Sequence, residues 1–132
     1  MNHKHIEERC PGAIFLGKAK LKNFKLVFDG FSSVLDCAVA NIVPEKGKTV
    51  YGGLFEITKD HFKSLDKYEN YPVMYKRKKF DCFYNGKIVK GTAYFRASQG
   101  KGRPSKAYLK IILDGAGDCG LSKDYIKSIL RG

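Results

Sequence analysis

Alternation of hydrophobic and polar residues dominates the first half of the chain and predicts extended structure. Aromatic and β-branched side chains are frequent there, as they are in half-buried strands. The stretches with this character are residues 13–21, 24–29, 37–43 and 49–57. Lys22-Asn23 predicts a hairpin turn between the first two stretches, and residues 44–47 predict a turn between the last two. Gly52-Gly53 predicts a bulge or a close backbone approach.

The strongest hairpin pattern lies further along the chain. Residues 75–84 and 87–95 alternate in the same way and are separated by Asn85-Gly86. This dipeptide suits a two-residue type I′ turn, because both residues tolerate positive φ. The second half of the chain therefore contributes two more strands.

A short amphipathic helix is predicted between these two groups of strands. Thr58 is a suitable N-cap, and Asn70, which tolerates a left-handed conformation, is a suitable end. Phe62, Leu65 and Glu69 share one face, whereas lysines at four-residue spacing occupy the other. A carboxylate on the apolar face is costly to bury unless it is paired, hydrogen-bonded or neutralised. Spacing alone leaves open whether Glu69 turns back to solvent or to a neighbouring cation, or has a chemical role.

Helices are also predicted at both ends of the chain. Residues 1–10 form about two turns with Asn2 as the cap. Near the other end, a loop rich in Gly, Lys and Arg at residues 98–103 leads into a helix that runs to Gly115. Glycines then mark a tight connection to a last helix, which is capped by Ser122.

Together these elements predict a single α+β domain over residues 1–132. Its core is expected to be a small mixed, mostly antiparallel sheet of about six strands, curled into a β-barrel with flanking helices. The chain has nine Phe and eight Tyr residues and is long enough to bury a core without disulfides or metals.

The chain is strongly basic, with 25 Lys and Arg against 13 Asp and Glu and a net charge of +12. These residues are dispersed, and the densest basic run is residues 76–79, so we interpret them as a solvated surface. An RNA-binding alternative rests on Phe80, Phe83 and Tyr84 near that run. Alternating aromatic residues of a hairpin more commonly belong to the core. We therefore do not expect a nucleic-acid partner.

The four cysteines and three histidines form no recognisable metal or redox motif. Scattered cysteines in a chain without a signal peptide favour a reducing cytoplasm. No apolar run approaches the length of a membrane span. We expect a cytoplasmic protein with no metal and no membrane partner, and the sequence does not indicate an oligomeric state.

An ordered set of short motifs resembles one family. In chain order the motifs are Arg9-Cys10-Pro11, Val50-Tyr51-Gly52-Gly53-Leu54, Leu65-Asp66-x-x-Glu69, Tyr75-x-Arg77, Pro104-Ser105-x-x-Tyr108, Gly115-Ala116 and Gly120-Leu121. Together they resemble the gamma-glutamylcyclotransferase-like (AIG2-like) family over almost the whole chain. The resemblance implies a small barrel that acts on a small-molecule gamma-glutamyl substrate. It also implies release of 5-oxoproline and an amine or amino acid, with no cofactor.

The resemblance further implies roles for particular residues. Glu69 matches the family's catalytic glutamate, Tyr108 matches a tyrosine that faces the substrate, and Tyr75 matches a pocket-side aromatic residue more loosely. Family members begin with a strand and a Tyr-Gly-Ser-Asn loop that holds the substrate. Met1-Asn2 stands just after the end of that loop, and Asn2 is a further substrate-binding candidate. We expect either a start assigned at an internal Met or a shortened member, for which a non-catalytic binding module is the alternative.

The implied chemistry accounts for a carboxylate on the apolar face. The α-amine of a γ-glutamyl group must lose a proton before it attacks the γ-carbonyl, and a positioned carboxylate can accept and return that proton. A glutamate with an ordinary pKa of about 4.3 is a poor base. We expect burial beside Phe62, Leu65 and Tyr68 to raise the pKa of Glu69. Asn70, where the family has Gly, tolerates the same positive φ.

Overall fold

The computed structural model describes residues 2–33, 35–97 and 100–130, and has four helices and four strands among them. In chain order they are α1 (His3–Arg9), β1 (Ile14–Ser32), β2 (Cys37–Glu56), α2 (Lys59–Tyr68), β3 (Lys76–Tyr84), β4 (Lys87–Phe95), α3 (Lys106–Asp118) and α4 (Lys123–Leu130). The α+β class predicted from the sequence is confirmed.

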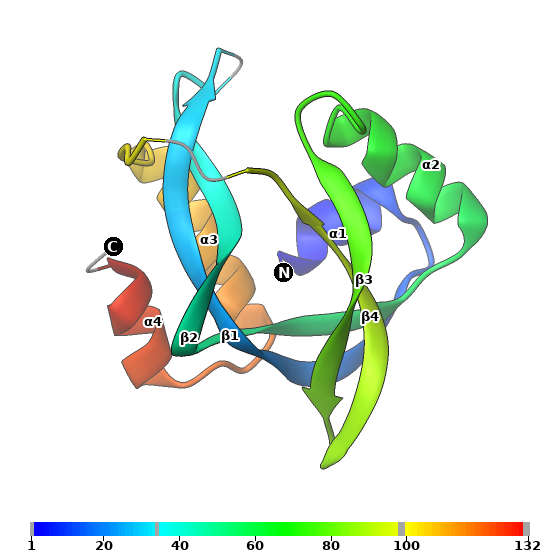
Figure 1. The fold of residues 1–132 in the computed structure, drawn as a ribbon. Coiled ribbons are helices and arrows are strands. Elements are labelled where there is room, and N and C mark those ends of the chain that lie inside the picture. Colours follow the sequence, from blue (N-terminus) through cyan, green and yellow to red (C-terminus); the bar gives the residue numbers. More distant parts are fainter. Residues whose placement is uncertain (1, 34, 98–99, 131–132) are drawn as a thin grey trace.

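The four strands form one antiparallel sheet in the order β2-β1-β3-β4. Two twisted hairpins, β1–β2 and β3–β4, meet where Lys20 of β1 pairs with Phe83 of β3 (Figure 1). The prediction of a mostly antiparallel sheet is confirmed. Closure into a barrel is not seen in the described strands, of which β2 and β4 are the edges. Within the described residues no backbone ladder joins these two strands, although the Asn41 side chain of β2 bridges to the Arg96 backbone just after β4.

The prediction of a hairpin turn at Lys22-Asn23 is wrong, because the two stretches on either side form one continuous strand, β1. Asn23 does have a positive φ of 67°, but it lies at a register shift of the β1–β2 ladder rather than at a reversal. The Gly47 backbone N–H donates to Asn23 Oδ1 at 3.2 Å across this irregularity. The turn predicted at residues 44–47 is likewise an irregularity within β2. A bulge and a turn favour the same residue types, so composition does not separate them.

The helix and turn ends predicted from local residues are confirmed. Thr58 caps α2 in a reciprocal capping box with His61, and Asn70 adopts φ 52° just beyond the helix. The β3–β4 turn has φ 51° at Asn85 and 76° at Gly86, as a type I′ turn requires.

Helix α3 is longer than predicted. It continues past Gly115 to Asp118, and the chain reverses at Gly120, which has φ 72°. Gly115 and Ala116 are buried, so close packing of the helix offsets the roughly 1 kcal/mol propensity cost of an interior glycine. The preceding loop, predicted over residues 98–103, is described from residue 100 onward, and residues 98–99 lie outside the described residues.

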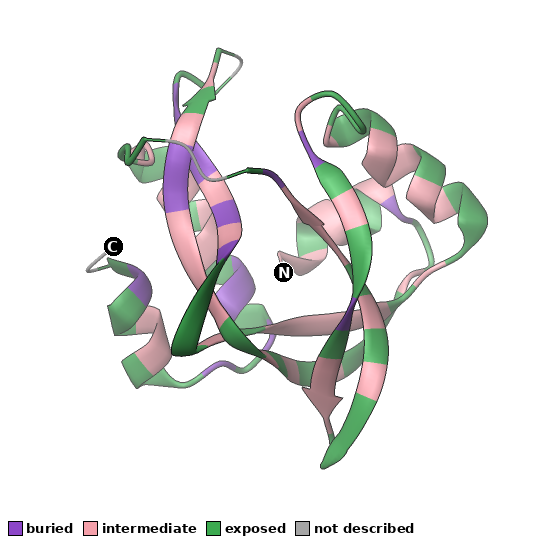
Figure 2. Cartoon of the chain, in the orientation of Figure 1, coloured by how far each residue is buried: buried purple, intermediate pink, exposed green. Residues whose placement is uncertain are grey.

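The main hydrophobic core lies where α3 and α4 pack against the β1–β2 hairpin (Figures 1 and 2). Its buried members are Phe28, Ala38, Ala116, Cys119, Leu121 and Ile129. A Cβ on Gly53 of β2 would lie 2.5 Å from the Cys119 sulfur. The predicted close approach at Gly52-Gly53 is thus present, although a side chain makes it.

Helix α1 joins the two sides of the molecule. The Asn2 amide donates to the Ile111 carbonyl of α3 at 3.2 Å. At the other end of α1, the Arg9 guanidinium lies 3.4 Å from the centre of the Tyr68 ring of α2. The predicted N-terminal helix is confirmed for the described residues. Its two ends thus contact the middle of α3 and the end of α2.

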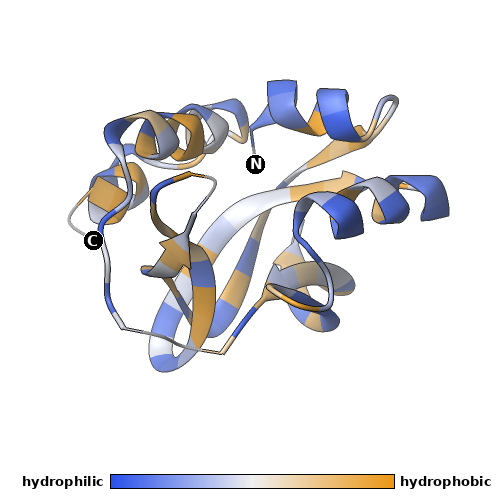
Figure 3. Cartoon of the chain, turned by 90° about the horizontal axis from the view of Figure 1, so that it is seen from above, coloured by the Kyte–Doolittle hydropathy of each residue, from blue (hydrophilic) through white to orange (hydrophobic). Residues whose placement is uncertain are grey.

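Hydrophilic residues are spread over the helices and strands rather than gathered in one segment (Figure 3). This distribution agrees with the dispersed charge of the sequence. None of the helices in the described ranges combines the length and the apolar character that crossing a membrane requires.

Candidate active site at the end of α2

Glu69 is the residue on which α2 ends. Its backbone N–H donates to the Leu65 carbonyl at 2.8 Å, which completes the last turn. Asn70 then reverses the chain, and the Tyr71 N–H returns to the Asp66 carbonyl at 2.8 Å. The Glu69 side chain makes no hydrogen bond or ion pair within the described part of the chain. The hydrogen bonds of the helix end thus fix the Glu69 backbone, while the oxygens of its side chain stay available to a ligand.

Burial raises the pKa of the Glu69 carboxyl, and the nearby positive charge of Arg9 opposes part of that rise. Arg9 does not pair with Glu69. Its guanidinium stacks over Tyr68 and approaches His5 Nδ1 at 3.2 Å. Tyr68, which we expected to help bury Glu69, is itself 52% exposed. The expected direction of the pKa shift is present, although Tyr68 faces outward.

Tyr75 and Tyr108 meet at one peptide of β2. The Tyr75 hydroxyl donates to the Ala40 carbonyl at 2.8 Å, and the Ala40 N–H donates to the Tyr108 hydroxyl oxygen at 3.0 Å. Burial raises the pKa of Tyr108 to about 12, and the negative charge of Glu69 adds to the rise. Burial also raises the pKa of Tyr75, again with a contribution from Glu69. The three predicted side chains therefore share one electrostatic environment.

The two tyrosines differ in what they can still offer to a ligand. Tyr108 uses its oxygen as an acceptor, which leaves its own O–H proton available to donate. Tyr75 is 8% exposed, and its O–H already donates a hydrogen bond to the Ala40 carbonyl. Tyr108 is therefore suited to bind a carbonyl or carboxylate oxygen, whereas Tyr75 is not.

A buried polar network lies behind Tyr75, and the sequence analysis missed it. Arg96 Nη1 lies 2.6 Å from Asp29 Oδ1, and the guanidinium carbon is 5.3 Å from the centre of the Tyr75 ring. The Asn41 side chain accepts from the Arg96 N–H and donates to the Arg96 carbonyl, each at 3.0 Å. This network ties β4 to the segment of β2 that holds Ala40. No local pattern relates three residues so far apart in the chain.

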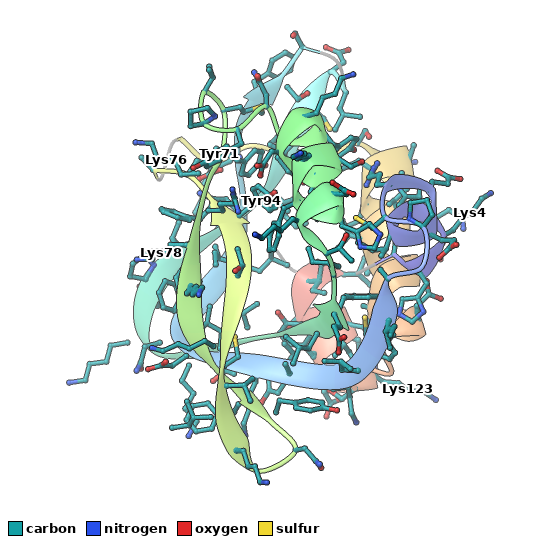
Figure 4. The ribbon with its side chains drawn as sticks, turned by 90° about the vertical axis from the view of Figure 1, so that its right-hand side faces the viewer. Lys4, Tyr71, Lys76, Lys78, Tyr94 and Lys123 are labelled. Atoms are coloured by element: carbon teal, nitrogen blue, oxygen red, sulfur yellow. The ribbon has the colours of Figure 1, made fainter. Side chains whose placement is uncertain are left out.

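A second group that the sequence analysis missed joins α2 to the β3–β4 hairpin. The Tyr94 hydroxyl donates to Asp66 Oδ1 at 2.5 Å, and Arg77 Nε lies 3.1 Å from the same oxygen. Burial raises the pKa of Tyr94, and its hydrogen bond to Asp66 adds to the rise. Tyr94 lies between the hairpin and α2, whereas Lys76 points away from the molecule (Figure 4). The Asp66 contacts fix the helix that presents Glu69.

Asn2 has a defined structural place. Its side-chain oxygen accepts from the His5 N–H at 3.1 Å, and its amide donates to the Ile111 carbonyl at 3.2 Å. Ile111 is one turn of α3 beyond Tyr108, so the start of α1 lies beside the helix that carries Tyr108. The role of Asn2 as a substrate contact remains a prediction.

Phe80, one of the aromatic residues near the basic run at residues 76–79, belongs to the core and is not available for stacking with a base. This ring is 6% exposed and packs edge-on against Phe24 and Phe95, with ring centres 5.3 and 6.0 Å apart. Among the residues that the structure describes, no three His, Cys, Asp or Glu side chains are grouped as metal ligands.

Comparison with known proteins supplies the family. The profile of the AIG2-like family matches residues 49–129. A gamma-glutamylcyclotransferase of Bos taurus is 30% identical, over 96% of this chain and 70% of the relative, and that of Mus musculus is 28% identical, over 92% and 68%. A solved gamma-glutamyl cyclotransferase structure superposes with a TM-score of 0.89 at 28% identity, over 96% of this chain and 79% of that one. The chain therefore belongs to the AIG2-like family and shares the fold of a gamma-glutamyl cyclotransferase.

Proposed function

We propose that this chain is a gamma-glutamylcyclotransferase-type enzyme in which Glu69 moves the protons. It converts a γ-glutamyl group into 5-oxoproline and releases an amine or amino acid. The observation that carries the proposal is the carboxylate of Glu69, which has a raised pKa and no ion-pair partner among the described residues. Membership of the AIG2-like family and similarity to gamma-glutamylcyclotransferases support the class of reaction.

The reaction is an intramolecular acyl transfer. The Glu69 carboxylate takes a proton from the substrate α-ammonium, and the neutral nitrogen attacks the γ-carbonyl carbon to form a five-membered ring. The bond from the γ-carbon to the leaving nitrogen then breaks, as Glu69 delivers its proton to that nitrogen. The attacking nitrogen sheds a second proton, and this also ends on the released amine. A general acid–base group positioned in this way typically raises the reaction rate by roughly a hundred- to ten-thousand-fold.

Tyr108 and Tyr75 are proposed to bind and orient the substrate. The available O–H of Tyr108 donates to an oxygen of the γ-glutamyl group, and Tyr75 shapes the pocket wall. The raised pKa of Tyr108, about 12, keeps this hydroxyl protonated at neutral pH. The reaction requires no cofactor, and the free thiols of the four cysteines accord with a proposed cytoplasmic location.

The test is an assay for 5-oxoproline from γ-glutamyl amino acids, γ-glutamyl amines and glutathione. We expect release from at least one of these classes, and a loss of roughly a hundred- to ten-thousand-fold in Glu69→Gln because the isosteric amide cannot accept the proton. Glu45→Gln, at an exposed position of β2, is the matched control and should retain wild-type turnover.

Circular dichroism establishes that the variants are folded. Wild-type turnover by folded Glu69→Gln would refute the role of Glu69. Absence of 5-oxoproline with every substrate class, together with saturable binding of a γ-glutamyl compound in calorimetry, would instead indicate a binding module of the same fold.

A further inference from the structure

Two adjoining grooves run along α4, away from the candidate active site. One has a volume of about 660 Å³ and the other about 780 Å³, and both are lined by Tyr125 and Ser128. Neither is lined by Glu69, Tyr75 or Tyr108. We call the combined feature the α4 groove.

The charged residues that line the α4 groove are almost all cationic. Its cationic lining residues are Lys18, Lys20, Lys25, Lys48, Lys101 and Arg103. None of these six is in an ion pair within the described ranges, and Asp124 is the single carboxylate among the lining residues. Six cations against one carboxylate favour an extended anion over a small neutral ligand, since a polyanion can neutralise cations in both grooves.

The floor of the larger groove is an aromatic row that crosses the sheet. Lys20 of β1 pairs with Tyr51 of β2 on one side and with Phe83 of β3 on the other, so these three residues are neighbours across the sheet. Tyr51 is 40% exposed and meets Tyr125 of α4 edge-on, with ring centres 4.8 Å apart. The Lys22 ammonium lies 4.4 Å from the centre of the Phe83 ring. The aromatic residues of this groove are thus Tyr51, Phe83 and Tyr125, and its cations are Lys18 and Lys20.

We propose that the α4 groove binds single-stranded nucleic acid. Cations that follow a phosphate backbone, together with accessible rings on which bases stack, are the combination that recognises single strands without sequence preference. An acidic peptide satisfies the cations but has no repeated planar groups for the aromatic floor. A duplex hides its base faces within its own stack. The proposed partner thus uses both features of the groove, at a site separate from the basic hairpin run at residues 76–79.

The test is fluorescence anisotropy with a labelled oligouridylate of about twelve nucleotides, titrated at several salt concentrations. We expect the logarithm of the affinity to fall linearly with the logarithm of salt. The double variant Lys18→Ala/Lys20→Ala should flatten that slope by about 1.4, or about 0.7 for each phosphate contact removed. Tyr51→Leu should weaken binding by about fivefold or more, because it removes a stacking ring but keeps an apolar side chain.

The matched control is Lys59→Ala/Lys63→Ala, which removes two exposed lysines from α2. It should keep the wild-type affinity and slope. Circular dichroism and unchanged 5-oxoproline release establish that the groove variants are folded.

Four results would overturn the proposal. The first is a loss of affinity in the α2 control equal to that in the groove variant, which would indicate attraction by net charge alone. The second is equal competition by polyglutamate, which would indicate an acidic polypeptide. The third is equal or tighter binding of a duplex of the same length. An absence of binding at low salt would overturn it as well.

Discussion

The carboxylates of Asp29 and Glu69 are both withdrawn from water, and they are held in opposite ways. The Asp29 side chain is 2% exposed and lies 2.6 Å from a guanidinium nitrogen of Arg96. The Arg96 guanidinium also donates to the Asp29 carbonyl at 2.9 Å. Glu69, at the end of α2, is half-buried and has no such partner in the described part of the chain.

The difference separates a structural carboxylate from a chemically available one. Asp29 joins strands of the two hairpins, because its partner is the residue just after β4. Near Glu69, Arg9 supplies positive charge, but stacking on Tyr68 holds its guanidinium away from the carboxylate. A carboxylate with a raised pKa and free oxygens can exchange a proton with a ligand. A carboxylate held in a buried ion pair is poorly placed to do so.

The largest expected effect concerns the paired carboxylate. Arg96→Met leaves the buried charge of Asp29 without its cation, and we expect a loss of about 3–5 kcal/mol in the free energy of unfolding. Urea denaturation measures this loss. The double variant Asp29→Leu/Arg96→Met removes both charges and should recover part of it. A loss below about 1 kcal/mol in the single variant would show that the pair does not hold the hairpins together.

A smaller loss is expected where α2 is attached to the hairpin. Asp66→Asn removes the charge that Arg77 and Tyr94 share, and we expect about 2 kcal/mol less stability because hydrogen bonds to a charged group are stronger than neutral ones. 5-Oxoproline release should fall as well, since Asp66 fixes the helix that presents Glu69. Asp60→Asn is the control, because its contact with Lys63 is largely exposed and should contribute little. Equal losses in the two variants would contradict this account.

Tyr108→Phe tests the candidate active site around Glu69. The hydroxyl accepts from the Ala40 N–H at 3.0 Å, so its removal should cost about 1 kcal/mol. Tyr84→Phe removes a hydrogen bond to the Leu16 carbonyl at 2.8 Å, and a similar loss is expected. Turnover should fall only in Tyr108→Phe. Equal turnover in both variants would place Tyr108 outside the substrate site.

Helix caps and turns could be predicted from the sequence, because they depend on residues that are neighbours in the chain. Thr58, Asn70 and Asn85-Gly86 each act within a few positions, through a cap or a positive φ, so their types were informative. The same local information failed at Asn23, because a left-handed Asn serves a bulge as well as a turn. The end of α3 was predicted too early because Gly115 is compatible with a helix when that helix is closely packed.

The arrangement around Glu69 depends on contacts between distant residues. Tyr75 and Tyr108 were proposed from family motifs, and they meet at Ala40, which is 35 and 68 positions away from them in the chain. Asp29 and Arg96 are 67 positions apart, and nothing in either local sequence indicates the partner. The pattern could therefore nominate Glu69 but could not exclude an ion pair with a neighbouring strand.

The smallest expected effect is the dependence of stability on pH at Glu69. Burial raises the pKa of this carboxyl above its unfolded value, so its stabilising contribution is full below the unfolded pKa, about 4.3, and is lost as pH rises through the folded pKa. Gln has no such titration. Relative to wild type, Glu69→Gln should therefore gain stability between about pH 4 and pH 7 while losing turnover. Urea midpoints at the two pH values measure the difference, and Glu45→Gln should show none. A carboxylate held by a cation gives the opposite sign, so a relative gain by wild type would show that a cation pairs with Glu69.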